Sequence, residues 1–105
     1  MNARAGGEES SVIRKGEPAI EAVLVTAPRC HLCEEAKTLL SDLEAEYPLR
    51  VRQVDLSSSE GLSLSRRHGM GFPPLLLIDG KRFGHGRISR RKLIHHLDQL
   101  LIRRS

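Results

Sequence analysis

The chain has 105 residues, of which 39% are hydrophobic and 29% charged, and its net charge is +4 at neutral pH. This is the length of one domain and the composition of a globular protein, which excludes a disordered chain. No apolar run approaches the roughly 20 residues that a membrane span needs, and no secretory signal is visible. We therefore expect a cytoplasmic protein with no membrane partner.

The basic residues do not form one patch. Their clusters at residues 66–67, 90–92 and 103–104 are scattered and have no aromatic side chains between them, unlike the surface of a nucleic-acid-binding protein. We interpret them as solvated helix faces. We expect a monomer without a nucleic-acid partner.

A polar segment precedes the first apolar one. Residues 1–17 are rich in glycine, serine and glutamate, which predicts a flexible N-terminal leader, and residues 18–105 are predicted to form one domain. The near-continuous apolar run at residues 19–26 predicts a central parallel strand that is covered on both faces. Residues 33–46 follow a helical period, with apolar positions on one stripe and glutamates in the first turn.

The next segment predicts a strand and then a helix. Residues 49–56 alternate imperfectly between apolar and polar side chains, which predicts a half-buried edge strand. A short helix is expected up to Arg67, with Ser58 or Ser59 as its N-cap. Gly61 lies inside this helix and weakens it.

The C-terminal part predicts a hairpin followed by a helix. The breakers at residues 68–74 precede a fully apolar strand at residues 75–78. Asp79-Gly80 predicts a tight turn, and residues 81–83 begin the returning strand. Ser89 is expected to cap the last helix. The apolar stripe of this helix consists of Leu93, Ile94, Leu97, Leu100 and Leu101.

The predicted element order is β-α-β-α-β-β-α. It joins a βαβ unit to a β-hairpin that is closed by a helix, and the right-handedness of crossovers leaves few ways to build this. We predict an α/β fold in which a four-stranded mixed sheet carries helices on both faces.

Two cysteines stand where the first strand gives way to the first helix. Cys30-His31-Leu32-Cys33 is a CxxC pair within a βαβ pattern, which is typical of a redox site. The free N–H groups and partial positive charge of a helix N-terminus stabilise an anion, and the thiolate is the nucleophile. We predict that Cys30 is the exposed attacking thiol and Cys33 the buried resolving thiol. The neighbouring cations, Arg29 and His31, favour the thiolate further.

Two segments resemble known redox proteins. Residues 26–37 (TAPRCHLCEEAK) look like the active-site segment of glutaredoxin-like proteins, and residues 68–77 resemble the loop and strand after the second helix of thioredoxins and glutaredoxins. The resemblance implies the thioredoxin fold, with a cis-proline that faces the CxxC pair. Pro73 matches this proline, with Pro74 as the alternative. Phe72 matches the preceding residue, whose backbone pairs with substrate.

The resemblance also implies a thiol–disulfide oxidoreductase that reduces or exchanges disulfides. The candidate site residues are Cys30 and Cys33 for catalysis, and Arg29, His31, Phe72 and Pro73 for substrate binding. The expected partners are a disulfide-containing protein or small molecule and a reductant of the glutathione or thioredoxin-reductase type. No organic cofactor or metal is expected. Residues 84–88, at which many glutaredoxins hold the amino-acid end of glutathione, include no acidic side chain here.

Two other functions would use the same cysteines. The thiolates could carry copper, zinc or an iron–sulfur cluster, since soft thiolates suit such metals, although two thiols and one imidazole are too few for a closed zinc site. The chain could also be an adaptor that keeps the fold around a vestigial redox pair. Metal analysis separates the first of these from an oxidoreductase, and the pH dependence of Cys30 alkylation separates the second.

Overall fold

The computed structural model describes residues 19–104, so the leader predicted for residues 1–17 lies outside the described residues. The elements are β1 (Ile20–Thr26), α1 (His31–Glu44), β2 (Leu49–Asp55), α2 (Ser59–His68), β3 (Leu75–Ile78), β4 (Lys81–His85) and α3 (Arg90–Arg104). Their order is the one that the sequence predicts. None of the helices within residues 19–104 is long and apolar enough to cross a lipid bilayer.

The four strands form one mixed sheet in the order β2-β1-β3-β4. β1 and β2 are parallel and are joined by α1, whereas β3 is antiparallel to both β1 and β4. β2 is an edge strand, as predicted. The turn between β3 and β4 is Asp79-Gly80, in which both residues have positive φ, 52° and 80°. This is the two-residue hairpin turn that an Asp-Gly pair favours.

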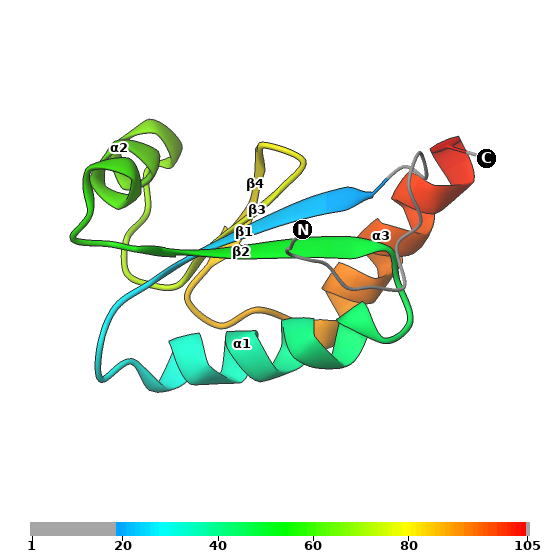
Figure 1. The fold of residues 1–105 in the computed structure, drawn as a ribbon, viewed down its shortest axis with the longest axis horizontal. Helices are drawn as coiled ribbons and strands as arrows, with labels where there is room; N and C mark the ends of the chain where they lie inside the picture. Colours follow the sequence, from blue (N-terminus) through cyan, green and yellow to red (C-terminus); the bar gives the residue numbers. More distant parts are fainter. Residues whose placement is uncertain (1–18, 105) are drawn as a thin grey trace, which may run out of the picture.

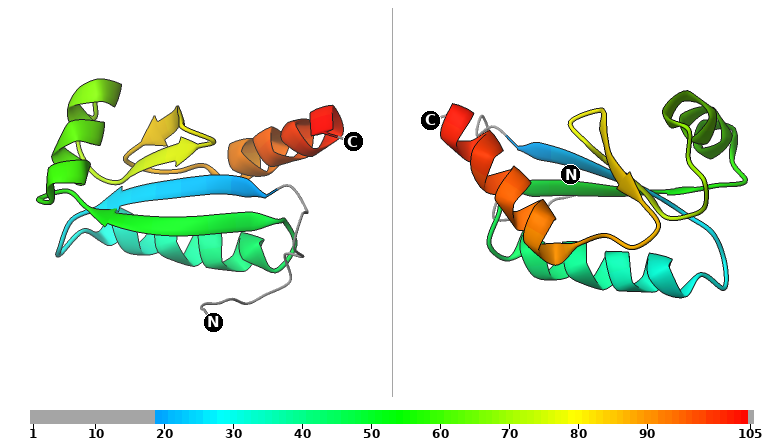
Figure 2. Two further views of the ribbon diagram at one scale, coloured as in Figure 1. Left: turned by 45° about the horizontal axis from the view of Figure 1, so that its top comes forward. Right: turned by 180° about the vertical axis from the view of Figure 1, so that it is seen from behind.

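Helices cover both faces of the sheet, which confirms the predicted architecture (Figure 1). α1 and α3 pack on one face and form the main core with β1 and β3, whereas α2 lies across the sheet from α1 (Figure 2). The largest fully buried side chains of the main core are Ile20, Leu24, Leu40, Leu43, Leu76, Leu93 and Leu97. Burial of each leucine or isoleucine stabilises the fold by about 1.5–3 kcal/mol relative to its exposure.

The second face of the sheet is covered at one end. α2 packs there on Val25, Val54, Leu75 and Leu77, at the carboxyl ends of β1 and β2. Glu21, near the start of β1, is exposed. The prediction that β1 is covered on both faces therefore holds only for its second half, because α2 lies over that end of the sheet and not along the strand (Figure 2).

Gly61 sets how closely α2 approaches the sheet. Ser58 is its N-cap, as predicted, and accepts a hydrogen bond from the N–H of Gly61 at 3.0 Å. A side chain at Gly61 would overlap the carbonyl oxygen of Asp55 and would come within 2.8 Å of the Leu56 Cα. Gly61 therefore does more than weaken a helix, since its missing Cβ lets α2 lie directly against the end of β2.

Candidate active site

Cys30 itself begins α1. It has an extended backbone conformation (φ −115°, ψ 103°), and its Sγ accepts a hydrogen bond from the N–H of Cys33 at 3.1 Å. A side-chain acceptor in this position is what an N-cap residue supplies. The helix therefore begins at His31, two residues before the predicted start, because the apolar stripe marks only the first buried residue and not the cap.

Cys30 and Cys33 form a disulfide with their Cα atoms 5.2 Å apart. The spacing of two intervening residues on the first helical turn produces this separation, which is in the usual range for a disulfide. Cys33 has 0% of its surface exposed, whereas Cys30 is half-buried. A partner from solution can therefore reach Cys30 and not Cys33.

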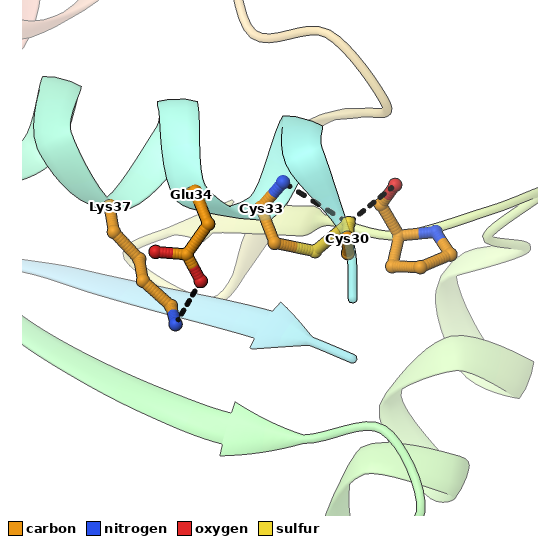
Figure 3. The surroundings of a disulfide bond; sticks show 5 residues. Cys30, Cys33, Glu34 and Lys37 are labelled. Carbon is orange, nitrogen blue, oxygen red and sulfur yellow. Dashed lines mark hydrogen bonds and ion pairs between the residues drawn. A yellow bond between two sulfur atoms is a disulfide. The ribbon is translucent and has the colours of Figure 1, made fainter. Parts of the chain in front are cut away.

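Two polar groups contact the Cys30 sulfur, and they act in opposite directions (Figure 3). The Cys33 N–H, at 3.1 Å, stabilises negative charge on the sulfur together with the partial positive charge of the helix N-terminus. The Pro73 carbonyl oxygen, at 3.9 Å, would accept a hydrogen bond from a thiol and would repel a thiolate. Because the N–H is the nearer group and the helix reinforces it, the two contacts together favour the thiolate.

The ion pairs around the dithiol are exposed. Glu35 contacts both His31 and Arg87, at 3.0 and 3.1 Å, and so links α1 to the segment after β4. Glu34 contacts Lys37 at 2.9 Å (Figure 3). Pairs of this kind contribute about 0–1 kcal/mol each, so their effect is to orient side chains and to neutralise charge rather than to hold the fold.

Arg29 is the cation nearest to Cys30 in the chain, and its backbone is in the left-handed region with φ 54°. Its side chain is exposed and makes no ion pair within residues 19–104. A non-glycine residue in this region costs on the order of 1 kcal/mol. Within residues 19–104 no acidic side chain pairs with it, so its positive charge in the residue before Cys30 favours an anion there.

The loop before β3 faces the dithiol, as the resemblance implies, but its details differ. The peptide bond between Pro73 and Pro74 is cis, so the assignment of the cis residue to Pro73 is wrong, and the residue that precedes the cis-proline is Pro73 rather than Phe72. Pro74 is fully buried, and its carbonyl accepts a hydrogen bond from the Gly86 N–H at 2.8 Å. The bend into β3 is therefore held at Pro74, while Pro73 directs its carbonyl toward Cys30.

Two residues that the sequence does not predict for the site support this loop, His85 at the end of β4 and Gly86 directly after it. The ring of His85 packs edge to face against that of Phe72, with ring centroids 5.5 Å apart. Nδ1 of His85 is buried and has no hydrogen-bond partner within the described part of the chain. A side chain at Gly86 would come within 2.8 Å of the Phe72 ring. From sequence, the glycines at positions 84 and 86 predict only that the returning strand is interrupted or ends there.

An open surface depression of about 450 Å³ lies along α1. It is lined by His31, Glu34, Glu35, Thr38, Leu39, Ile88 and Arg90, and neither cysteine lines it. Carboxylates and cations thus surround the apolar side chains of Leu39 and Ile88 there. Within residues 19–104, no three histidine, cysteine or acidic side chains gather in the way that would hold a metal ion.

A comparison with protein families identifies a family that matches this chain. A family model described as "Glutaredoxin-like domain (DUF836)" matches residues 21–99. The chain belongs to this glutaredoxin-like family. The match includes all of α1 and the loop before β3, and it confirms the family resemblance on which the sequence analysis drew.

Solved structures of other proteins share the fold. A malarial protein superposes with a TM-score of 0.61 at 19% identity, over 78% of this chain and 97% of its own. The reduced thioredoxin pre-protein of Schistosoma mansoni gives 0.59 at 19% identity, over 77% and 78%. A mutant thioredoxin from Halobacterium salinarum gives 0.57 at 19% identity, over 76% and 73%. This likeness confirms the predicted thioredoxin fold. Among curated proteins, no sequence matches significantly.

Proposed function

We propose that this glutaredoxin-like protein is a thiol–disulfide oxidoreductase in which Cys30 attacks and Cys33 resolves. One observation supports it above all. The two cysteines are disulfide-bonded at the N-terminus of α1, with Cys30 partly accessible and Cys33 fully buried. An accessible sulfur that receives an N–H bond from the helix suits nucleophilic attack, and a buried sulfur beside it suits an intramolecular second step.

The reaction is a pair of thiol–disulfide exchanges. The Cys30 thiolate attacks a substrate disulfide R–S–S–R′, the bond between the substrate sulfurs breaks, and R′–S⁻ leaves and takes a proton from water. Cys33 then loses its proton and attacks the Cys30 sulfur, which releases R–S⁻ and closes the Cys30–Cys33 disulfide. Two electrons pass to the substrate, and a thiol reductant returns the protein to the dithiol by the reverse exchanges.

The surrounding residues have defined parts in this proposal. Arg29 supplies positive charge beside the thiolate, His31 borders the substrate and is oriented by Glu35, and the loop of Phe72 and Pro73 presents the substrate. The chemistry needs no organic cofactor or metal. The reductant would be a glutathione or thioredoxin-reductase system, and a reducing compartment such as the cytoplasm would keep the pair in its active dithiol form.

The test uses the two single-cysteine variants. Cys30→Ser should abolish reduction of a model disulfide such as insulin, with turnover driven in parallel by a glutathione system and by a thioredoxin-reductase system. Cys33→Ser should attack but not resolve, and so should accumulate a mixed disulfide that mass spectrometry assigns to Cys30. Full activity of Cys30→Ser would end the proposal, as would the absence of any mixed disulfide in Cys33→Ser.

The alternative of a metal carrier is tested on the same samples. Protein purified without air is analysed for copper, zinc and iron, and its absorption spectrum is recorded. Stoichiometric metal that is lost in Cys30→Ser, together with no disulfide turnover in the wild type, would favour the carrier. Turnover by protein without bound metal would favour the oxidoreductase.

A further inference from the structure

An aromatic side chain lies exposed next to the reactive pair. Within residues 19–104, three large apolar side chains are exposed: Leu62, Phe72 and Ile102, at 41%, 57% and 65%. Single exposed apolar residues are ordinary on protein surfaces, so exposure alone does not indicate a binding site. Phe72 differs in position, because it precedes Pro73, whose carbonyl oxygen contacts the Cys30 sulfur.

The Phe72 ring is also held in place. It packs edge to face on His85, with an angle of 84° between the ring planes, and it lies so close to Gly86 that a Cβ there would be 2.8 Å from the ring. Gly86 is buried with φ +73°, a conformation that favours glycine. His85 and Gly86 therefore support one side of the ring and leave the other side exposed, which gives an apolar surface packed on its neighbours.

The backbone of the same loop offers little to a bound peptide. Pro73 and Pro74 have no N–H, so neither can donate a hydrogen bond. The Pro74 carbonyl already accepts from Gly86, which leaves the Pro73 carbonyl as an acceptor facing Cys30. A peptide chain can donate one hydrogen bond to Pro73 but cannot exchange the pair of bonds that strand pairing needs. Selection among peptides must therefore come largely from side-chain contacts.

Phe72 and the substrate residue that flanks the reactive cysteine each lie only one residue from the contact between Pro73 and Cys30. In a mixed disulfide, the substrate sulfur is about 2 Å from the Cys30 sulfur, which itself is 3.9 Å from the Pro73 oxygen. Phe72 is one residue from Pro73, and the flanking residue of the substrate is one residue from the disulfide. Consecutive Cα atoms are about 3.8 Å apart, so both side chains start close to the contact between Pro73 and Cys30. The two side chains can meet beside the loop.

We infer that the substrates are peptide or protein disulfides in which an apolar side chain flanks the reactive cysteine and packs on the open face of Phe72. This inference rests on the proposed oxidoreductase function and narrows its substrate class. A small disulfide without such a side chain has nothing to place on the ring. Loss of one well-placed apolar contact lowers kcat/KM about tenfold, so the preference should be of this size.

The experiment compares two peptides that differ beside their cysteine. Each carries one cysteine in a mixed disulfide with thionitrobenzoate, and leucine in one peptide is replaced by glycine in the other. Reduced protein is mixed with each peptide, and the rate of thionitrobenzoate release is followed by absorbance. We expect the wild type to react about tenfold faster with the leucine peptide. Phe72→Ala should bring the ratio of the two rates close to one.

The matched control is Ile102→Ala, which removes another exposed apolar side chain from the last turn of α3, the end of which lies on the opposite side of the molecule from the start of α1 (Figure 1). It should keep the wild-type ratio. His85→Ala, which removes the support of the ring, should lower the ratio less than Phe72→Ala does. A Phe72→Ala ratio equal to that of the wild type would overturn the inference, and so would an equal fall in both rates. Failure of the proposed function has a different result, since then neither peptide would react through Cys30.

Discussion

Alanine in place of Gly61 should destabilise the protein, although the same change usually stabilises a helix. At an exposed position inside a helix, Gly→Ala raises the free energy of unfolding by about 1 kcal/mol. Gly61 is buried in α2, and its N–H bond to Ser58 would survive the change. The new methyl group, however, would overlap the Asp55 carbonyl oxygen and lie 2.8 Å from both the Asp55 carbonyl carbon and the Leu56 Cα.

The magnitude follows from what must move. All three contacted atoms belong to the backbone at the end of β2, so no side chain can turn aside. Carbon atoms pack at about 3.5–4.0 Å, so the N-terminus of α2 must withdraw by about 1 Å. Overpacking costs about 1–3 kcal/mol, and an overlap with backbone atoms belongs in the upper half of this range, about 2–3 kcal/mol, which exceeds the gain of about 1 kcal/mol in helix propensity. We expect a net loss of about 1–2 kcal/mol, equivalent to a fall in Tm of about 5–15 °C for a domain of this size.

The assay is urea unfolding followed by far-ultraviolet circular dichroism, because the chain has no tryptophan. Ser63→Ala is the control: Ser63 is exposed on the same helix, and the change should raise the free energy of unfolding by a few tenths of a kcal/mol through propensity alone. A Gly61→Ala variant as stable as the wild type, or more stable, would refute the argument that α2 is seated through this glycine.

Three further predictions concern single side chains. The pKa of Tyr47 is raised from 10.0, first by its hydrogen bond to Asp98, so the absorbance of this single tyrosinate should develop above pH 10, and Asp98→Ala should shift the transition to lower pH. The pKa of Asp55 is lowered by hydrogen bonds from the hydroxyl and N–H of Ser57. Asp55 therefore contributes stability above the unfolded pKa of about 3.9 and loses it as the pH falls through the lower folded pKa. In urea titrations Asp55→Asn should weaken this acid dependence, and an unchanged dependence would contradict the assignment. Leu93→Ala, at a fully buried position of α3, should cost about 2–5 kcal/mol of unfolding free energy, whereas the exposed Ile102→Ala should change it by less than about 0.5 kcal/mol.

Most of the fold follows from local patterns in the sequence. The near-continuous apolar run of β1 and the fully apolar run of β3 predict central strands because strands that their neighbours bury have few polar positions. Asp79-Gly80 predicts its turn because both residues accept positive φ. Ser58 and Ser89 predict helix starts because a serine hydroxyl can accept a hydrogen bond from a free N–H group of the first turn. Each of them accepts such a backbone bond, as expected. Signals of this kind need no knowledge of distant residues.

The details of the site depend on contacts between distant segments, which no local pattern contains. The sequence does not distinguish Pro73 from Pro74 as the cis-proline. Only the structure shows that Pro74 is the one whose carbonyl accepts a hydrogen bond from Gly86, the residue that follows β4. Phe72 and His85 are 13 positions apart in the chain. Their rings meet because β3 pairs with β4, in a register that includes an irregularity. The bridge from Glu35 to Arg87 spans an even longer stretch of chain. These contacts arise from packing, so the sequence predicts the residues near the dithiol but not their partners.

The cap of α1 also decides which variant can test the chemistry. One sulfur serves both as the proposed nucleophile and as the acceptor for the Cys33 N–H, so a substitution that removed both properties would confound loss of reactivity with fraying of the first turn. Serine is among the best N-cap residues, whereas alanine at an N-cap costs about 0.5–2 kcal/mol. Cys30→Ser therefore keeps the helix start but removes the thiol and, with it, the disulfide to Cys33. If Cys30→Ser and Cys30→Ala are equally inactive while only the alanine variant is less stable than the reduced wild type, the lost activity belongs to the sulfur and not to the structure around it.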